Sequence, residues 1–428
     1  MDKTVYELAM RRIELVFNEF DNIYVSLSGG KDSGILLNLC MDYIKKNRLS
    51  RKIGVFHIDY EIQYNETIKY VERTLQSYPE YFEIYHVCVP FKVNTCTSMY
   101  QTFWRPWDND CKDLWVREMP ANCYTEKDFP FYDPDMWDSE FYILFAQWCH
   151  RLKNAKKTCC LVGIRTQESQ HRWNTIHSNR RNQMYHNLKW TRQLADNLYN
   201  AYVIYDWLTT DVWTANGKFG WDYNRLYDLY YQAGVPLEKQ RVASPFISAG
   251  QGYLSLYRTI DPDMWGKMIC RVNGVNFTAM YGRTHAVARR DVKLPPGHTW
   301  ESFMYFLLSA LPESTRNNYL QKLAVSISFW RERGGCLSEE TIADLRSHGI
   351  KIDVLDDTNY KTDKRPVKME YQDTVDIPDF KSVPSFKRMC ICILRNDHLC
   401  KYMGFALTKK EIEKRKMIME FYQNITQY

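Results

Sequence analysis

The sequence predicts an α/β protein in which a mostly parallel sheet is flanked by helices and is followed by a smaller, mainly helical C-terminal region. Apolar patterns of strand type and helix type alternate along the first half of the chain, as they do where helices connect parallel strands. The segment SGGKDS at residues 28–33 stands between a strand pattern and a helix pattern. The length of 428 residues exceeds the usual size of one hydrophobic core, so a second domain is expected.

The chain begins with a helix, a strand, a turn and a second helix. Apolar residues recur at steps of three and four over residues 5–20, which predicts an amphipathic helix. Residues 23–27 form a short run of β type, and helical spacing returns over residues 34–44. Small and polar residues separate the last two segments, so the strand leads through a turn directly into a helix.

The same alternation continues to residue 246. Strands are expected at residues 52–58, 81–89, 159–162 and 202–205, and helices at residues 67–75 and 223–233. Between about residues 90 and 138 the pattern fades and tryptophans appear among Pro, Asn and Asp, which indicates an aromatic-rich insertion near the sheet edge. We therefore assign residues 1–246 to one domain.

Two further regions follow this domain. Helical spacing at residues 300–311 and 314–330 predicts that residues 247–352 are mainly helical. Residues 353–428 are interpreted as a linker or lid, rich in Asp, Lys and Pro up to residue 384, and a Cys-containing C-terminal segment. A capping-box pattern at residues 408–411 predicts a Lys-rich helix at the end of this segment.

The composition is that of a folded protein. Aromatic residues make up 15% of the chain and charged residues 25%, while the net charge of +6 favours anionic ligands without establishing nucleic-acid binding. The sequence lacks an apolar run of about eighteen residues and a signal-peptide pattern, so we expect a cytoplasmic protein with no membrane partner. Most of the 13 cysteines are expected to be reduced core thiols.

A phosphate-binding loop is expected where the first strand meets the second helix. Glycines permit a tight turn and close approach of the backbone to an anion, and the N–H groups at a helix N-terminus attract negative charge. Hydroxyl groups add hydrogen bonds, and a lysine either adds charge or faces solvent. The residues assigned to this loop are Ser28, Gly29, Gly30, Lys31, Asp32 and Ser33.

Asp32 is unusual in such a loop because a carboxylate repels phosphate. We expect it to cap the helix or to act indirectly through Mg²⁺. The spacing fits neither the Walker loop nor the dinucleotide fingerprint. SGGKDS between a strand and a helix is instead the PP-loop signature, so residues 1–246 are interpreted as a PP-loop nucleotide-binding domain in preference to one with a plain tight turn.

Three more segments carry a resemblance to a known family. They are GIRTQES at residues 163–169, YDWLTTDVW at residues 205–213 and GWDYNRLY at residues 220–227. With them, the chain resembles the phosphoadenosine phosphosulfate (PAPS) reductase family within the PP-loop superfamily of adenine nucleotide α-hydrolases. Segments at residues 59–64, 104–107, 243–246 and 400–405 look like a subgroup that carries a C-terminal domain of unknown function and includes immunoglobulin-binding regulators.

The resemblance implies a ligand and a set of site residues. ATP or PAPS would place its phosphates on residues 28–33 and its adenosine against the ends of the neighbouring strands. Asp59, at the end of a predicted strand, would then lie near the nucleotide or a metal, with capping of the next helix as the alternative.

Two groups of side chains are candidates for the reaction. Arginines suit bidentate recognition of phosphate or sulfate, and a glutamate can orient an arginine or a metal-bound water. The catalytic candidates are therefore Arg165, Glu168 and Arg172, with an internal ion-pair cluster as the alternative. An acceptor site is expected at Trp104, Arg105 and Trp107, with aromatic core packing as the alternative.

The cysteines depart from the reductase pattern. The reductases resembled here attack sulfur with a cysteine in a Glu-Cys-Gly-(Ile/Leu)-His tail, and this sequence has no such string. The nearest substitutes are Cys390, Cys392 and Cys400, which with His398 offer four zinc ligands or are buried thiols.

Other cysteines and histidines are expected to be structural. The adjacent Cys159 and Cys160 are similar to a pair in iron–sulfur reductases, but they lie in a buried-strand pattern, so packing is preferred and an iron–sulfur cluster is not expected. His57, His86 and His150 are expected to be hydrogen-bonded core residues.

Three functions follow from these patterns. The first is cleavage of ATP at the α-phosphate to adenylate an unknown acceptor, with Mg²⁺. The second is a nucleotide-sensing protein in transcriptional regulation, bound to a protein partner or to nucleic acid through basic patches at residues 180–181 and 409–416. The third is PAPS reduction, for which the nucleophile motif is missing.

Overall fold

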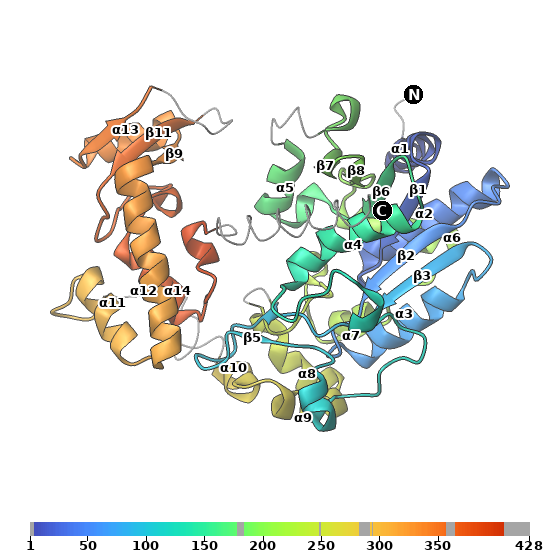
Figure 1. Ribbon diagram of the computed structural model, residues 1–428, viewed down its shortest axis with the longest axis horizontal. Coiled ribbons are helices and arrows are strands. Elements are labelled where there is room, and N and C mark those ends of the chain that lie inside the picture. The colour runs from blue at the N-terminus through green and yellow to red at the C-terminus, as the bar shows by residue number, and fades with distance from the viewer. Residues whose placement is uncertain are drawn as a thin grey trace. The chain divides into compact units, whose positions relative to one another are not determined.

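Alternating strands and helices in the first half of the chain form a six-stranded sheet in the computed structural model (Figure 1). The strands lie in the order β3-β2-β1-β6-β8-β7. They are β1 (Asn22–Ser26), β2 (Ile53–Ile58), β3 (Phe82–Val87), β6 (Thr158–Val162), β7 (Thr191–Ala195) and β8 (Leu198–Ala201). All neighbours pair in parallel except β7 and β8, which confirms the predicted mostly parallel sheet.

The structure describes residues 4–177, 184–247, 250–281, 292, 294–356 and 364–405. The chain divides into two units, each made from separate stretches of sequence. The first unit contains Met1–Val93, Arg105–Ser244 and Leu256–Arg271, and the second contains Asn94–Trp104, Pro245–Ser255 and Val272–Tyr428. The change of unit after Ser244 lies close to the boundary expected at residue 246.

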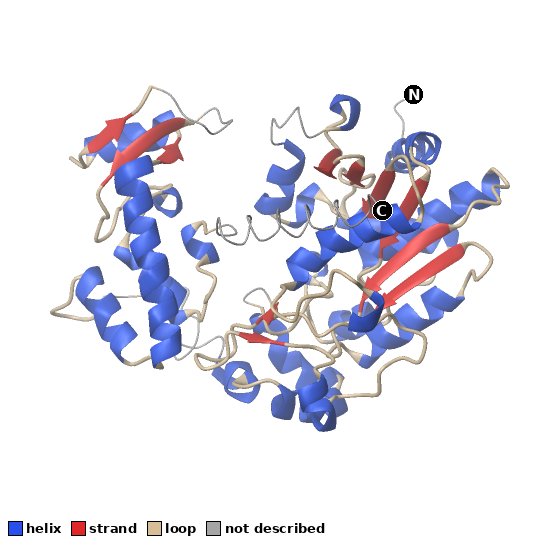
Figure 2. Ribbon diagram, viewed as in Figure 1, coloured by secondary structure: helices blue, strands red, loops and turns tan. Residues whose placement is uncertain are grey.

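Helices cover both faces of the sheet in the first unit (Figure 2). The helices of this unit are α1 (Val5–Glu19), α2 (Lys31–Lys46), α3 (Asn65–Gln76), α4 (Asp138–Leu152), α5 (Gln170–His177), α6 (Thr209–Phe219), α7 (Leu226–Gln232), α8 (Tyr257–Ile260) and α9 (Pro262–Arg271). The first helix begins with a capping box in which Glu7 N donates to Thr4 Oγ1 at 3.3 Å and Thr4 N donates to the Glu7 carboxylate at 2.8 Å.

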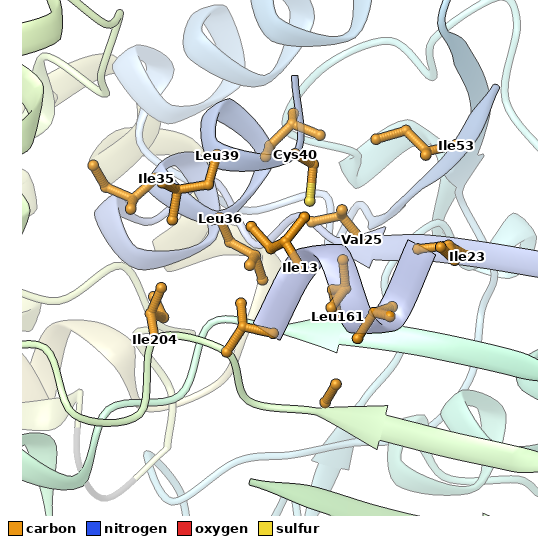
Figure 3. Close-up of a cluster of buried hydrophobic side chains, with 14 of the residues drawn as sticks. Ile13, Ile23, Val25, Ile35, Leu36, Leu39, Cys40, Ile53, Leu161 and Ile204 are labelled. Atoms are coloured by element: carbon orange, nitrogen blue, oxygen red, sulfur yellow. The ribbon is translucent and has the colours of Figure 1, made fainter. Parts of the chain in front are cut away.

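One face of the sheet packs against α1 and α2. Their apolar side chains meet those of β1, β2 and β6 in a continuous buried cluster (Figure 3). The opposite face packs against α4, where the Phe145 ring stacks on Phe56 with centroids 4.0 Å apart. Burial of both faces explains why the strands read as continuous apolar runs rather than as alternating patterns.

The prediction of a strand at residues 202–205 is wrong. The strand β8 ends at Ala201, and the chain then turns, with Tyr205 N donating to Tyr202 O at 3.1 Å. Val203 and Ile204 are fully buried in the core beside the sheet. A short apolar run signals burial, and period alone does not separate a strand from a buried turn.

The second unit contains helices and a small sheet. Its helices are α10 (Val275–Tyr281), α11 (Trp300–Ser309), α12 (Glu313–Ser328), α13 (Glu339–Ser347) and α14 (Phe386–Leu394). Its antiparallel sheet has the order β10-β11-β9, with β9 (Gly335–Leu337), β10 (Ile352–Val354) and β11 (Arg365–Met369). The short strands β4 (Val93–Asn94) and β5 (Phe103–Trp104) pair with each other.

The interpretation of residues 353–384 as a linker or lid is corrected by this small sheet. The strand β11 falls inside the segment, and Val367, Val375, Ile377 and Val383 are buried in one core cluster with α13. Alternating apolar positions among the Asp, Lys and Pro residues supply that core. The Lys-rich helix expected from residue 408 lies outside the described residues.

Among the described residues, no helix is both long enough and apolar enough to span a bilayer.

Gly163, directly after β6, allows two parts of the first unit to touch through backbone alone. A Cβ atom there would lie 2.8 Å from the Asp32 carbonyl carbon and 2.9 Å from Ser33 N, closer than real contacts allow. The loop after β6 therefore rests on the first turn of α2.

We expect Gly163→Ala to lower the free energy of unfolding of the first unit by about 1–3 kcal/mol, because the methyl group must push two backbones apart. Chemical denaturation measures this. Gly217→Ala is the matched control: Gly217 lies in α6 with nothing within 4 Å of its added Cβ, so that change should stabilise by about 0.5–1 kcal/mol. Equal effects of the two changes would contradict the packing argument.

Candidate functional site

The carboxyl ends of β1 and β6 define the point at which the chain changes direction across the sheet. From β1 the chain continues to β2 and β3 on one side, and β6 pairs with β1 on the other side, with Ser26 opposite Val162. Open α/β sheets bind their ligands at the carboxyl edge, near such a change of direction. The 28–33 loop and the 163–169 segment both start here.

The 28–33 loop has a backbone that requires glycine. Gly29 has φ +76°, and a Cβ at this position would lie 2.8 Å from Cγ2 of Thr67. Asn224 Nδ2 donates to the carbonyl oxygen of Gly29 and to Thr67 Oγ1, both at 2.9 Å. The turn is therefore fixed from outside by a buried amide on the segment before α7.

Hydroxyl groups organise the inside of the loop. Ser33 Oγ accepts from Ser28 N at 3.2 Å and donates to Gly30 O at 3.0 Å. The backbone N–H groups of Gly29, Asp32 and Ser33 have no hydrogen-bond partner among the described residues. Unpaired donors at the start of a helix form a concavity suited to an anion.

Asp32 does not cap the helix, contrary to one expectation. The N-cap of α2 is Gly30, and the Asp32 carboxylate accepts from Arg165 Nε at 2.5 Å. Arg165 is 2% exposed and also donates to the carbonyl oxygen of Trp207 and to Thr209 Oγ1. The alternative of an internal ion pair, considered from the sequence, therefore describes Arg165 in this structure.

Lys31 does not face solvent. Its ammonium group donates to the carbonyl oxygen of Gln240 at 3.2 Å and lies 3.5 Å from Asp32 Oδ2. Burial lowers the pKa of Lys31. One carboxylate thus lies between two cations, Lys31 and Arg165, beneath the loop.

The two remaining catalytic candidates form a pair in the segment after β6, and neither lines the pocket described below. Arg172 Nη1 lies 2.5 Å from Glu168 Oε2. The side chain of Arg172 is 37% exposed, whereas that of Glu168 is 8% exposed. Arg241 donates to the Glu168 carbonyl oxygen. The structure thus brings Glu168 and Arg172 together, with the arginine accessible from solvent.

A pocket opens beside the 28–33 loop. Its empty volume is about 660 Å³, part of which is open to solvent. It is lined by Ser26, Leu27, Ser28, Ile58, Tyr60, Ile62, Gln63, Tyr64, Thr67, Tyr142, Tyr230, Val242, Ala243, Ser244 and Tyr257. The Ser244 hydroxyl is buried and has no hydrogen-bond partner among the described residues, so a free donor lies in a largely aromatic and apolar lining.

Asp59 follows β2, as expected, and is buried in a polar cluster. His86 Nε2 lies 3.1 Å from Asp59 Oδ2, and Arg117 forms an ion pair with Oδ1. Although burial raises it, the pKa of Asp59 is held below its usual range by Arg117 and His86. Burial and the adjacent His86 lower the pKa of His57 to about 4, so His57 is neutral.

The histidines of this cluster were missed from the sequence, where each appears as an isolated core residue. His57 and Asp59 are two apart, so their side chains leave the same face of the chain, and His86 is the parallel register partner of His57. The i, i+2 spacing was the available signal, but the register that adds His86 is not visible in the sequence.

The proposed acceptor residues do not line the pocket. Trp104 and Trp107 are 2% and 0% exposed, and Trp107 Nε1 donates to the Asp59 carbonyl oxygen at 2.7 Å. Arg105 donates to the carbonyl oxygens of Pro90 and Pro134. These contacts fit aromatic core packing, which was the alternative interpretation of these residues from the sequence.

The second unit does not assemble the four possible metal ligands at its C-terminal end. Cys390 Sγ donates to Trp300 O at 3.4 Å, Cys392 Sγ donates to Asp397, and His398 Nε2 lies 3.1 Å from Ser98 O. Among the described residues, the group whose ligand atoms lie close enough together to hold a metal ion is His57, Asp59 and His86. Cys400 and its neighbours do not form such a group.

Comparison with known proteins divides the chain at residue 234. Residues 22–234 match the phosphoadenosine phosphosulfate reductase domain, and residues 234–414 match DUF3440, a domain of unknown function. An Escherichia coli K12 protein, the uncharacterized protein YbdN, is 30% identical over 416 residues, which cover 96% of this chain and 93% of the relative.

Several solved structures are similar to part of this chain at low identity. FMN adenylyltransferase of Candida glabrata is 15% identical, with 52% of this chain and 58% of the other covered and a TM-score of 0.32. PAPS reductase of Candida auris is 14% identical, with 52% and 84% covered and a TM-score of 0.29. The tRNA thiolase NcsA of Methanococcus maripaludis is 12% identical, with 68% and 86% covered and a TM-score of 0.29. At these TM-scores the likeness carries no argument about activity.

Three observations indicate the same family. They are the loop at the carboxyl end of β1, the two matching domain models and the relative that matches over 96% of this chain. The chain belongs to the PAPS-reductase-like PP-loop family whose members join a phosphoadenosine phosphosulfate reductase domain to DUF3440.

Proposed function

We propose that this protein binds ATP or a related adenine nucleotide and cleaves it at the α-phosphate to adenylate an acceptor. The observation that carries the proposal is the continuity of pocket and loop: Ser28 belongs to both. The nucleoside would occupy the pocket, and the phosphates would lie on the 28–33 loop. In the reaction an acceptor oxygen bonds to the α-phosphorus, the bond to the bridging oxygen breaks, pyrophosphate leaves, and the acceptor proton passes to solvent.

The loop suits a departing pyrophosphate. Three unpaired N–H groups and the positive end of the α2 dipole would stabilise the negative charge that develops on the leaving group. Arg165 supports this indirectly, because its ion pair with Asp32 holds the first turn of α2 in place. Arg172 is more accessible than Arg165 and is proposed to contact a ligand, with Glu168 orienting it.

The carboxylates of Asp32 and Asp59 are not free to bind Mg²⁺. Asp32 is paired with Arg165, and Asp59 is paired with Arg117. Mg²⁺ commonly binds through substrate phosphates and water. The donor set therefore fits a Mg²⁺ ion carried by the nucleotide rather than one held by these two side chains.

The three cysteines nearest to the missing reductase motif, Cys390, Cys392 and Cys400, are buried, which favours adenylation over PAPS reduction by these thiols. Burial raises the pKa of Cys390 to about 12, and burial also raises the pKa of Cys392 well above its usual value. A sulfur nucleophile must be an accessible thiolate. Cys159 and Cys160 lie inside β6 and are buried, in keeping with a packing role.

A role in transcription is not supported by the comparisons. The basic patches that suggested it, at residues 180–181 and 409–416, lie outside the described residues. The proposal therefore rests on the nucleotide site and names no protein or nucleic-acid partner.

We expect the wild-type chain to bind ATP with Mg²⁺ more tightly than PAPS, and Ser33→Ala to weaken ATP binding at least about tenfold, or about 1.4 kcal/mol, because the hydroxyl orders the loop. Equilibrium titration measures this. Ser77→Ala is the matched control, since Ser77 lies at the exposed end of α3 with its hydroxyl on Thr74 O. Preference for PAPS would favour reduction, and binding of neither nucleotide would refute the proposal.

We expect Ser244→Ala to weaken nucleotide binding by about 0.5–1.5 kcal/mol, the net value of one hydrogen bond, while leaving the thermal stability of the free protein unchanged. The reason is that the Ser244 hydroxyl has no hydrogen-bond partner among the described residues. Titration with ATP and a melting curve without ATP give the two values. Unchanged affinity would show that the nucleotide does not contact Ser244 in the pocket.

A further inference from the structure

Three ligand-type side chains meet at the carboxyl ends of β2 and β3. One ring nitrogen of His57, one ring nitrogen of His86 and one carboxylate oxygen of Asp59 all lie within 4.8 Å of one another. The side chains come from adjacent parallel strands, with His57 and His86 in register. All three residues are buried, with exposures of 2%, 8% and 3% for His57, His86 and Asp59.

The Asp59 carboxylate is divided between two kinds of partner. Its Oδ1 accepts from Glu61 N at 2.9 Å and from Arg117. Its Oδ2 faces His86 Nε2 at 3.1 Å. The first oxygen is therefore occupied by groups that fix the carboxylate plane, and the second oxygen points into the cluster.

His57 is oriented as metal-binding histidines are. Its Nδ1 lies 2.7 Å from the carbonyl oxygen of Leu27, and because that oxygen only accepts, Nδ1 carries the proton. The other nitrogen, Nε2, then presents a lone pair. A ring N–H held by a backbone carbonyl is the usual support for a metal-ligating imidazole.

We propose that His57, Asp59 and His86 form a binding site for a divalent transition metal of the zinc class, with water in the remaining position. Two imidazoles and one carboxylate are a common set for zinc, and ligand atoms at about 2.0–2.2 Å from one ion lie within about 4.4 Å of each other. A small rotation of the rings closes the set from its present spacing.

Binding requires one rearrangement and no net loss of a proton. The proton that His86 Nε2 shares with Asp59 moves to Nδ1, which frees Nε2 for the ion. Oxygen-seeking Mg²⁺ and Ca²⁺ are disfavoured, because two of the three ligands are nitrogen. Arg117 places a positive charge next to the site, so binding is weaker than at a site with a second carboxylate.

The site would join the end of β2 to the end of β3 beside the pocket. Ile58 and Tyr60, on either side of Asp59, line the pocket, as does Leu27, whose carbonyl oxygen orients His57. With all three ligands buried, the expected effect is to stabilise this edge of the sheet. The inference does not depend on nucleotide binding.

The test uses the full-length chain, freed of metal with a chelator and titrated with Zn²⁺ and with Co²⁺ as a visible probe. We expect one ion per chain, a visible Co²⁺ spectrum and a higher melting temperature with Zn²⁺, since a ligand that binds the folded state stabilises it. His57→Gln and His86→Gln should each abolish the spectrum and the shift. His150→Gln, a matched control whose Nδ1 bonds Thr158 Oγ1 at 2.8 Å, should keep both.

Absence of Zn²⁺ and Co²⁺ binding by the wild-type chain would overturn the proposal even if the variants fail to fold. So would stoichiometric binding that survives in the His57 and His86 variants. An intense thiolate-to-cobalt absorption band would place the ion on cysteines and would also overturn it. Loss of nucleotide binding with intact metal binding would affect the proposed function alone.

Discussion

The buried ion pair between Arg165 and Asp32 is the interaction on which the candidate site depends. It links the segment after β6 to the first turn of α2, and so connects the two loops that leave the sheet at its change of direction. Removal of one partner from a buried pair costs about 3–5 kcal/mol, since the other charge is left without compensation. Lys31 on the opposite side of Asp32 makes this carboxylate the centre of a charge cluster beneath the 28–33 loop.

Close packing adds a steric constraint to this electrostatic one. Gly163 lets the β6 loop lie directly on the α2 backbone, and Gly29 turns against Thr67. With the loop held from both sides, its free N–H groups are ordered before any ligand arrives. Preorganised donors of this kind need no rearrangement when they meet a charge.

The carboxyl edge of the sheet has a second polar centre around Asp59. Here too the carboxylate is paired with an arginine, in this case Arg117, but two histidines belong to the cluster in place of a lysine. The two centres lie at the ends of the neighbouring strands β1 and β2, and residues at both strand ends line the pocket. The same edge thus offers nitrogen donors to an anion at one place and ligands to a cation at another.

Much of the first unit was predictable because its signals are local. Short apolar runs predict strands β1, β2, β3 and β6. Small residues, whose backbone freedom the turn requires, predict the phosphate-type loop. The apolar run at residues 202–205 misled for the same reason, since burial in a turn gives the same pattern as burial in a strand. The core of residues 353–384 was hidden by a charged composition.

The sequence by itself determined the α/β class, the position of the 28–33 loop and the family, because each depends on residues adjacent in the chain. Only the tertiary structure decided what the charged side chains do. It buried Lys31, paired Asp32 with Arg165, and brought His86 to His57. These outcomes depend on strand order and register, and neither is encoded in the spacing of any one segment.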